Sequence, residues 1–438
     1  MDAEAWSLKA RWVVPVTTPP LENGVVDIVG DKITGVRRGG GATVDLGEVI
    51  LLPGLVNAHT HLDLTGFSRA VSPPATFAEW IRTVIRHRLA ESAEQRLAAV
   101  RSGIRQSMAH GVSLLGDISV DGSSGRLLEG FPLGGTVYHE ILGVNESRAA
   151  QTRQVAEMWL KEGPTARVVR GISPHAPYST RRELFQWAAG RGIPAQIHLA
   201  ETDEEMALLA TGTGPLVDML RDLGLWPAAD SFLSMAGLLD LMGARSPRAP
   251  LGLVHANHLP VEMAGQLGPE TTLIHCPRTH AWFGREPFPI AAWMKAGVRI
   301  ALGTDGEACA PDLDVLAEAR ALFARLSNLA PALILSMCTV NGAAALGWEG
   351  LQGALAENFW PTRWPFRRTT RICLFAPWNK SLEEACGPAV CSGLVVCPER
   401  CFRKKGGALP LAKDRVGAEH VNRLLPLCRN QSECRWVI

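Results

Sequence analysis

Apolar and polar positions follow two different rhythms, and the rhythm changes close to residue 50. Before this point, short apolar runs alternate with turn residues and predict strands at 11–16, 24–30 and 33–36. A Gly-Gly-Gly cluster at 39–41 predicts a loop after the third strand. Residues 1–50 are therefore expected to form a small β-structure of the sandwich type ahead of the main domain.

Residues 51–350 alternate apolar runs with amphipathic segments of helical period. The apolar runs predict strands at 49–52 (leading into His59), 112–115, 136–142, 168–172, 195–199, 251–255, 272–275 and 298–302. The amphipathic segments predict helices at 77–89, 94–110, 147–161, 181–191, 204–211, 290–296, 313–326 and 333–346. Eight strands alternating with helices are typical of a (β/α)8 barrel of the TIM type, an α/β fold. An open doubly wound sheet is the alternative, but no G-x-G-x-x-G motif follows the first strand.

The last segment, residues 351–438, differs in composition from everything before it. It is rich in Arg, Cys and Trp, it holds seven of the ten cysteines, and Asp414 is its only aspartate. Such a change suggests out-of-frame translation or an unrelated replacement tail, poorly folded or disordered, which would leave the N-terminal β-structure incomplete. A structural zinc site is the competing hypothesis, but the cysteines concerned do not form paired C-x-x-C motifs. They are Cys386, Cys391, Cys397 and Cys401.

Composition and charge exclude several classes of protein. The apolar fraction is 47% and the formal net charge is +1, so neither nucleic acid nor an anionic membrane is expected as a partner. No run of about 18 apolar residues predicts a transmembrane helix, and the acidic N-terminus does not resemble a signal peptide. Only three scattered cysteines precede the tail, so a reduced, cytoplasmic protein is expected. A small-molecule substrate is the expected partner, and a homo-oligomer is left open.

Ionisable side chains recur at the C-terminal ends of the predicted strands, the face on which barrel enzymes build their active sites. They are His59, His61, Asp117, Glu140, His175, His198, Glu201, His255, His275 and Asp305. Their recurrence on successive strands supports the barrel and predicts one shared site.

His59 and His61 lie two residues apart just past a strand, so both imidazoles point to one side and could grip one metal ion. Such a pair alone is weak evidence, because histidines also serve as core or surface groups. His198 and Asp305 are the best groups to complete the site. A divalent ion with an open coordination position would activate water near neutral pH.

Glu201 and His255 are the candidates for the proton chemistry. Glu201 could take the proton of water and pass it to the substrate nitrogen, although an acid in the first turn of a helix is explained equally well by the helix dipole. His255 could hold the attacking water or stabilise the leaving nitrogen, and His258 is expected to be structural. The other histidines lack converging partners (His87, His110 and His420) or stay ambiguous (His139, His275 and His280).

Five motifs occur in order along the chain: LPGLVNAHTH at 52–61, SPHAPY at 173–178, HLAE at 198–201, VHANHL at 254–259 and LGTD at 302–305. Together they resemble the amidohydrolase superfamily, and within it the cytosine-deaminase-like branch that includes nucleoside and guanine deaminases and triazine chlorohydrolases. The resemblance implies a metal ion, zinc or iron, held by residues matching His59, His61, His198 and Asp305. It also implies that Glu201 and His255 handle the proton and the water.

The resemblance further implies substrate contacts and the number of metals. In nucleoside deaminases of this branch, the residue matching His175 contacts the base, and a pair matching Glu79-Trp80 binds ribose hydroxyls. Binuclear relatives use a carboxylated lysine at the end of the fourth strand, where this chain has Ser-Pro-His at 173–175. Lys161, the nearest lysine, lies at a predicted helix end. One metal ion is therefore expected, with zinc first and iron as the alternative.

The expected reaction is hydrolysis of a carbon–nitrogen bond other than a peptide bond. Deamination of an aromatic amidine, such as the adenine of a nucleoside, fits best. The alternatives are a chlorohydrolase or guanine-deaminase type of activity, or a catalytically impaired remnant of such an enzyme. After Asp305 relatives usually carry a small polar run, whereas this chain has Gly-Glu-Ala-Cys-Ala at 306–310, so the substrate fit around this loop is expected to differ.

Overall fold

The computed structural model describes residues 5–30, 32–67, 73–226, 232–244, 247–357, 372–375 and 394–396. The chain divides into two compact units, the first built around residues 1–53 and the second around residues 54–353. Most of the tail lies outside the described residues, and so do His420 and the four cysteines of the zinc hypothesis.

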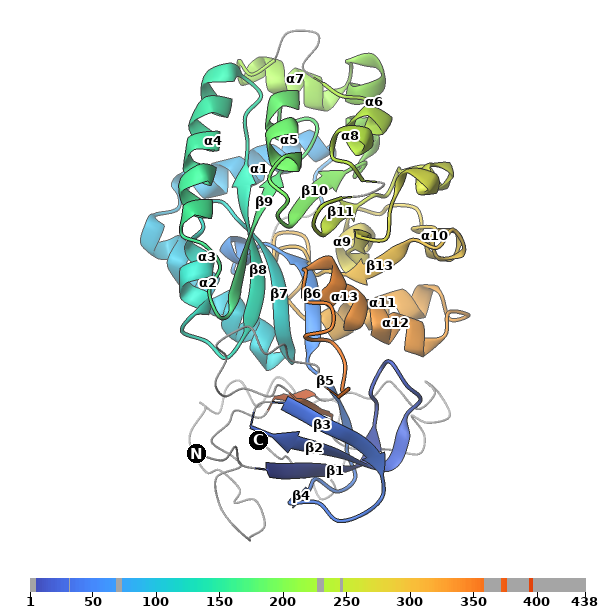
Figure 1. Cartoon of the computed structure of the whole chain (residues 1–438). Helices are drawn as coiled ribbons and strands as arrows, with labels where there is room; N and C mark the ends of the chain where they lie inside the picture. Colours follow the sequence, from blue (N-terminus) through green and yellow to red (C-terminus); the bar gives the residue numbers. More distant parts are fainter. Residues whose placement is uncertain are drawn as a thin grey trace. The chain divides into compact units, whose positions relative to one another are not determined.

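The first unit is a mixed sheet of short strands (Figure 1). Its strands are β1 (Ala5–Val13), β2 (Leu21–Val29), β3 (Lys32–Arg38), β4 (Val44–Asp45), β5 (Ile50–Pro53), β14 (Ile372–Phe375) and β15 (Leu394–Val396). Their order is β15-β14-β5-β1-β2-β3, with β4 paired to β1, and Leu8, Val13, Val26 and Ile28 belong to the core against them. The tail was expected to supply no strand, yet two short apolar runs of it, ICLF and LVV, extend the sheet next to β5.

The second unit confirms the predicted barrel. Its parallel strands are β6 (Leu55–Thr60), β7 (Val112–Ser119), β8 (Gly134–Ile141), β9 (Val168–Pro174), β10 (Ala195–Leu199), β11 (Leu251–His255), β12 (Thr271–His275) and β13 (Arg299–Leu302). They neighbour one another in chain order from β6 to β13. The barrel nearly closes where the backbone N–H groups of Thr304 and Asp305 donate to the His59 carbonyl, at 3.0 and 3.1 Å. Gly303 permits this approach, because a Cβ there would lie 2.8 Å from the same carbonyl oxygen.

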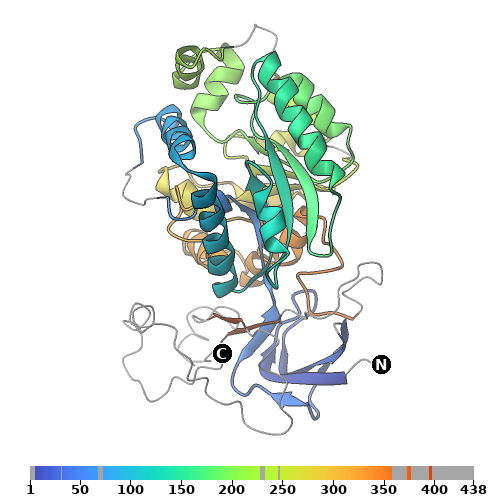
Figure 2. The same cartoon turned by 90° about the vertical axis from the view of Figure 1, so that its left-hand side faces the viewer.

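Helices lie outside the barrel strands in both views (Figures 1 and 2). They are α1 (Phe77–Ala90), α2 (Ala93–Ala109), α3 (Ser123–Leu128), α4 (Glu146–Lys161), α5 (Arg182–Ala189), α6 (Asp203–Thr211), α7 (Pro215–Asp222), α8 (Met235–Leu241), α9 (Pro277–Trp282), α10 (Ile290–Lys295), α11 (Val315–Arg325), α12 (Pro331–Met337) and α13 (Val340–Ala345). The 3-10 turns η1 (Leu62–Leu64) and η3 (Val261–Gln266) complete the set. Among the described helices, none has the length and apolarity needed to cross a membrane.

The structure corrects the sequence-based boundaries in three places. The strand expected at 49–52 belongs to the first unit as β5, and the barrel begins with β6 after Gly54, whose missing Cβ makes room for Ser113. The helix expected at 333–346 is two helices, because Thr339 leaves the helical region of backbone conformation. Four helices of six to eight residues, α3, α7, α8 and α9, were not predicted, since segments this short show little periodicity.

Candidate active site

The ends of the barrel strands bring the predicted metal ligands together. His59 lies in β6, His198 in β10 and His255 at the end of β11. His61 follows β6 directly, and Asp305 lies three residues after the end of β13. All five are buried, with at most 8% of the residue exposed. A parallel barrel collects these side chains on one face because its strands all end there.

The donor atoms of these residues converge. Nε2 of His61 lies 3.5 Å from Oδ1 of Asp305 and 3.4 Å from Nε2 of His198. Nε2 of His59 lies 3.7 Å from the same Asp305 oxygen. In the described part of the chain, two groups have all ligand atoms within 4.8 Å of one another: His59 with His61 and Asp305, and His59 with His198 and His255. The structure thus brings together the four predicted ligands and adds the His255 ring to them.

The outer nitrogens of His59 and His198 are already hydrogen bonded, which aims their other nitrogens inward. Gln196 donates its amide to the Ala58 carbonyl at 2.8 Å, so its Oε1 accepts from Nδ1 of His59 at 2.9 Å. Nδ1 of His198 lies 3.2 Å from the His175 carbonyl and donates to it. Nε2 of His59 is buried without a hydrogen-bond partner among the described residues. Three imidazoles and a carboxylate held in this way fit one divalent metal ion such as zinc.

The electrostatics of the cluster favour the metal-binding protonation states. Burial lowers the pKa of His61 and His198 well below the ordinary value, and neighbouring imidazoles lower it further. Burial alone would raise the pKa of Asp305, but the nearby imidazoles of His59, His255 and His61 bring that pKa well below its usual range. Neutral imidazoles and an ionised carboxylate are the forms that bind metals.

Strained backbone is concentrated at these strand ends. Four non-glycine residues here have positive φ: Ala200 (51°), His255 (68°), Ala256 (51°) and Asp305 (57°). Each such residue costs on the order of 1–3 kcal/mol and persists only where the surroundings enforce it. Strain of this kind gathers at functional sites, so it marks the same location as the converging ligands.

Glu201 lies beside the cluster and is fixed by three groups. Its Oε2 is 3.7 Å from Nε2 of His255, and its Oε1 accepts from Arg285 Nη2 at 3.0 Å. The Glu205 carboxylate accepts from the backbone N–H groups of Ala200 and Glu201 at 3.1 and 2.8 Å. Glu201 is therefore not a solvated acid placed before α6 for the helix dipole alone, because its side chain is 6% exposed and faces His255.

Sequence reasoning missed Gln196, Glu205 and Arg285. Gln196 stands two residues before His198 in β10, so period-two spacing could have placed both side chains on one face. Glu205 lies three residues after Thr202, the N-cap of α6, so the T-x-x-E spacing could have marked it as a residue of the helix start next to Glu201. Arg285 lies in an irregular segment after α9, and no pattern in the sequence indicates its contact with Glu201.

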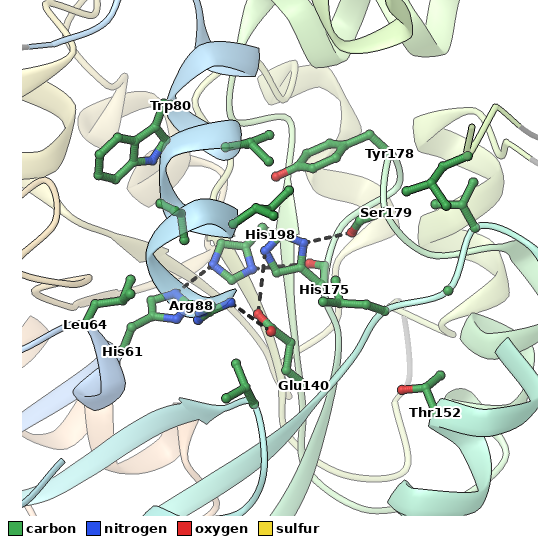
Figure 3. Close-up of a pocket in the computed structure, with 18 of the residues that line it drawn as sticks. His61, Leu64, Trp80, Arg88, Glu140, Thr152, His175, Tyr178, Ser179 and His198 are labelled. Carbon is green, nitrogen blue, oxygen red and sulfur yellow. Dashed lines mark hydrogen bonds and ion pairs between the residues drawn. The ribbon is translucent and has the colours of Figure 1, made fainter. Parts of the chain in front are cut away.

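A cavity of about 730 Å³ opens beside the cluster, a size common for small-molecule sites. His61, His198, Glu201, His255 and Asp305 line it. So do His175 and Trp80, as the sequence predicted for substrate contacts (Figure 3). Glu79, the other member of the predicted pair, is exposed on α1 and does not line the cavity. One residue along a helix turns the side chain by about 100°, so the two members of the pair face different directions.

Other residues considered in the sequence lie around the site, and most of them have local partners. Asp117 accepts from the backbone N–H of Leu62 at 2.9 Å, which supports the turn after β6. His275 stacks on Phe288, and His280 contacts the side chain of Asn257 through Nδ1 at 3.1 Å. His258 pairs with Asp203 at 3.1 Å on the surface, in keeping with a structural role. His139 lines the cavity.

The unusual segment 306–310 forms part of the cavity wall. Ala308 and Cys309 line the cavity, and the Cys309 thiol lies 3.3 Å from Oδ2 of Asp305. Glu307 is buried and accepts from the Gly66 backbone and the Gln106 amide, at 2.7 and 2.6 Å. The segment is thus ordered by its own polar contacts, and it places small apolar side chains where substrate would lie.

Fold, ligands and cavity together define a metal-dependent hydrolase of the barrel type. Residues 50–359 match the amidohydrolase family, and the chain belongs to that family. It is accordingly a hydrolase that acts on carbon–nitrogen bonds, as its motifs predicted.

The individual relatives share less than a third of their sequence with this chain. The chain is 28% identical to the 5-methylthioadenosine/S-adenosylhomocysteine deaminase of Moorella thermoacetica, over 80% of this chain and 82% of the relative. Among solved structures, it resembles the aminofutalosine deaminase of Helicobacter pylori in complex with methylthio-coformycin, with a TM-score of 0.73 and 20% identity over 86% of this chain and 94% of that one. An adenosine deaminase of Xanthomonas campestris with bound zinc has a TM-score of 0.67 and 20% identity, with 84% of each chain covered.

Proposed function

We propose that this protein is a hydrolytic deaminase of an adenine-type nucleoside and that it uses one divalent metal ion, zinc in the first instance. One observation carries the proposal: a buried cluster of His59, His61, His198 and Asp305 borders Glu201 and His255 at the inner end of a large cavity. The named relatives act on or bind nucleosides of this kind, and one of them holds zinc, which supports the same direction.

The ligand residues would hold the metal through Nε2 of the histidines and a carboxylate oxygen of Asp305. When bound, a divalent ion lowers the pKa of water so that it becomes a nucleophile near neutral pH. Glu201 would remove a proton from the attacking water and return it to the nitrogen that leaves as ammonia. His255, 3.7 Å from Glu201 Oε2 and 3.9 Å from Asp305 Oδ2, would orient that water between the two carboxylates.

The site is suited to one metal ion rather than two. The fourth barrel strand, β9, ends in Ser173-Pro174, and His175 follows. Lys161 is exposed in the last turn of α4, outside the cavity lining. A lysine that could bridge a second metal is therefore lacking among the described cavity residues.

The cavity also suits a nucleoside. His175 lies next to the cluster, with its ring centroid 4.6 Å from that of His198, and Trp80 lines the same cavity. The ring faces of these two residues would contact the purine. Beyond them the wall is mainly apolar, and it includes Ile81, Val84 and Leu220. A wall of this kind fits the sugar and an uncharged 5′ substituent, and it desolvates the reacting ring so that charged groups act on it strongly.

Ammonia release tests the proposal. Zinc-loaded protein would be assayed with adenosine, 5′-methylthioadenosine, S-adenosylhomocysteine and guanine, and chloride release would be followed with a chlorotriazine. We expect ammonia from at least one adenine nucleoside. Ammonia from guanine alone would indicate a guanine deaminase instead. Chloride from the chlorotriazine without any ammonia would indicate a chlorohydrolase. Silence across the panel from a folded, zinc-loaded sample would indicate a catalytically impaired remnant.

The matched control is Glu201→Gln, which keeps the size of the side chain but cannot carry the proton. It should bind zinc as the wild type does and lose ammonia release by roughly 10²- to 10⁴-fold. Undiminished ammonia release by this variant would remove Glu201 from the proposed mechanism.

A further inference from the structure

Glu140, at the end of β8, has no assigned role in the chemistry above, yet it lies at the cavity beside His175 (Figure 3). Its side chain is 1% exposed. Oε2 accepts from Arg88 Nη1 at 3.1 Å, whereas Oε1 is buried and has no hydrogen-bond partner among the described residues. A buried carboxylate oxygen without a donor is costly, and in a native protein it calls for an explanation.

Arg88 is shared by two carboxylates, and the two differ in position. Asp63 receives Nε and Nη2 of Arg88 on one oxygen, each at 3.0 Å, and its other oxygen is also unpartnered. Asp63 does not line the cavity, whereas Glu140 does. Arg88, Asp63 and Glu140 form a triad that links α1 to η1 and β8. If this link were its only role, the Glu140 carboxylate would not need to lie at the cavity.

On the cavity side, Nε2 of His175 lies 3.9 Å from Glu140 Oε1. This separation is too long for a direct hydrogen bond. The His175 ring is held from its other side, because Nδ1 lies 2.8 Å from the Ser179 hydroxyl. The Ser179 hydroxyl donates to the Ala176 carbonyl at 3.2 Å, so Nδ1 of His175 donates to Ser179 and Nε2 is left as an acceptor. Because a hydroxyl has one proton, two neighbouring hydroxyls on the cavity side could donate one hydrogen bond each, to Glu140 Oε1 and to His175 Nε2.

We propose that Glu140 Oε1 and His175 Nε2 form a subsite that accepts one hydrogen bond each from two neighbouring sugar hydroxyls of the substrate. The inference rests on the proposed function, since it assumes a nucleoside with its base near the metal cluster. His175 lies directly beside that cluster, with its ring centroid 4.6 Å from that of His198. Glu140 lies next to His175, within reach of the sugar of a nucleoside whose base is bound beside the cluster. Glu79, exposed on α1, is not available for this contact.

The test is direct binding of two probes that carry no amino group and so release no ammonia. They are purine riboside and its 2′,3′-dideoxy analogue, titrated calorimetrically into the zinc-loaded protein. A hydrogen bond to a charged acceptor should make the riboside bind roughly 10- to 100-fold more tightly. Equal affinity of the wild type for the two probes overturns the proposal without any variant.

Two matched variants separate recognition from structure. Glu140→Gln should keep its carbonyl oxygen on Arg88 and turn its NH2 group toward His175, so the preference for the riboside should fall to about threefold or less. Asp63→Asn removes the other carboxylate of the same triad and should keep the wild-type preference. Glu140→Asp, with a retracted carboxylate, serves as a second variant if the first does not fold. Parallel loss of affinity for both probes in the Gln and Asn variants would show that Glu140 is only a structural partner of Arg88.

The outcomes also distinguish this inference from the proposed function. If the preference exists and depends on Glu140 but no adenine nucleoside yields ammonia, the subsite stands and deamination fails. If ammonia is released but the preference is absent or neither probe binds, deamination stands and the subsite fails. If neither probe binds and no ammonia is released, both proposals are overturned.

Discussion

Replacement of Gln196 by Met tests whether the histidine cluster is a metal site. The Gln196 side chain is fully buried, orients the His59 ring through the 2.9 Å bond to Nδ1, and is itself held by the Ala58 carbonyl. Met fills a similar volume but cannot accept the N–H of His59. The ring then loses the bond that fixes its tautomer and aims Nε2 at the cluster.

The expected effect has two parts. Loss of two buried hydrogen bonds and the resulting unpaired groups should lower the free energy of unfolding by about 2–4 kcal/mol. Loss of an outer partner of a metal-binding histidine typically weakens metal affinity by about 10- to 100-fold, which corresponds to about 1.4–2.7 kcal/mol. Only the second part is specific to a metal site.

Thr136→Val is the matched control. Thr136 is equally buried in β8 and also makes two hydrogen bonds, to the Leu346 carbonyl at 2.7 Å and from Trp348 Nε1 at 3.0 Å. It does not line the cavity. Zinc affinity of the metal-free proteins would be measured by competition with a chromophoric chelator, and stability by urea denaturation. If Gln196→Met and Thr136→Val bind zinc equally well, the reasoning about His59 is refuted.

Three further predictions concern stability and metal dependence. Burial and the neighbouring Glu201 raise the pKa of Glu205 from 4.5 to about 8, so the folded form holds this proton more tightly than the unfolded chain. The stabilisation from this proton is complete below pH 4.5 and is lost as pH rises through about 8. Glu205→Gln, which cannot ionise, should therefore gain stability relative to the wild type between about pH 5 and 9, as measured by urea denaturation. A difference in unfolding free energy that does not change with pH would contradict the raised pKa of Glu205. Gly303→Ala places a Cβ 2.8 Å from the His59 carbonyl oxygen and should lower the melting temperature and zinc occupancy together, whereas Gly265→Ala, with open space at its Cβ, should leave both intact. A chelator should lower the melting temperature of the wild type and added zinc should restore it; an unchanged melting curve would argue against a bound ion.

The sequence alone was sufficient for the barrel and for the groups at its strand ends. Both depend on local patterns: strands such as 195–199 and 251–255 are short apolar runs with the predicted bounds, and histidines two residues apart on a strand share a face. The position of a side chain past the end of a parallel strand then follows from the fold itself.

Contacts that depend on the rotation of a helix about its axis, or on irregular segments, could not be predicted from the sequence. A motif pairing Glu79 with Trp80 does not say which of the two faces the cavity, and the structure selects Trp80. The contact between Arg285 and Glu201 joins residues 84 positions apart through a segment without periodicity. Left-handed backbone at His255 and Asp305 likewise has no signal in residue type alone.

The most direct test of the account is a zinc titration of ammonia release. Metal-free protein at known concentration would receive increasing zinc and be assayed with 5′-methylthioadenosine. The account predicts activity that rises linearly, breaks at one equivalent of zinc per chain and then stays level. A break at two equivalents would contradict the single-metal site, and ammonia release that persists in the metal-free protein would contradict the metal-dependent chemistry at its centre.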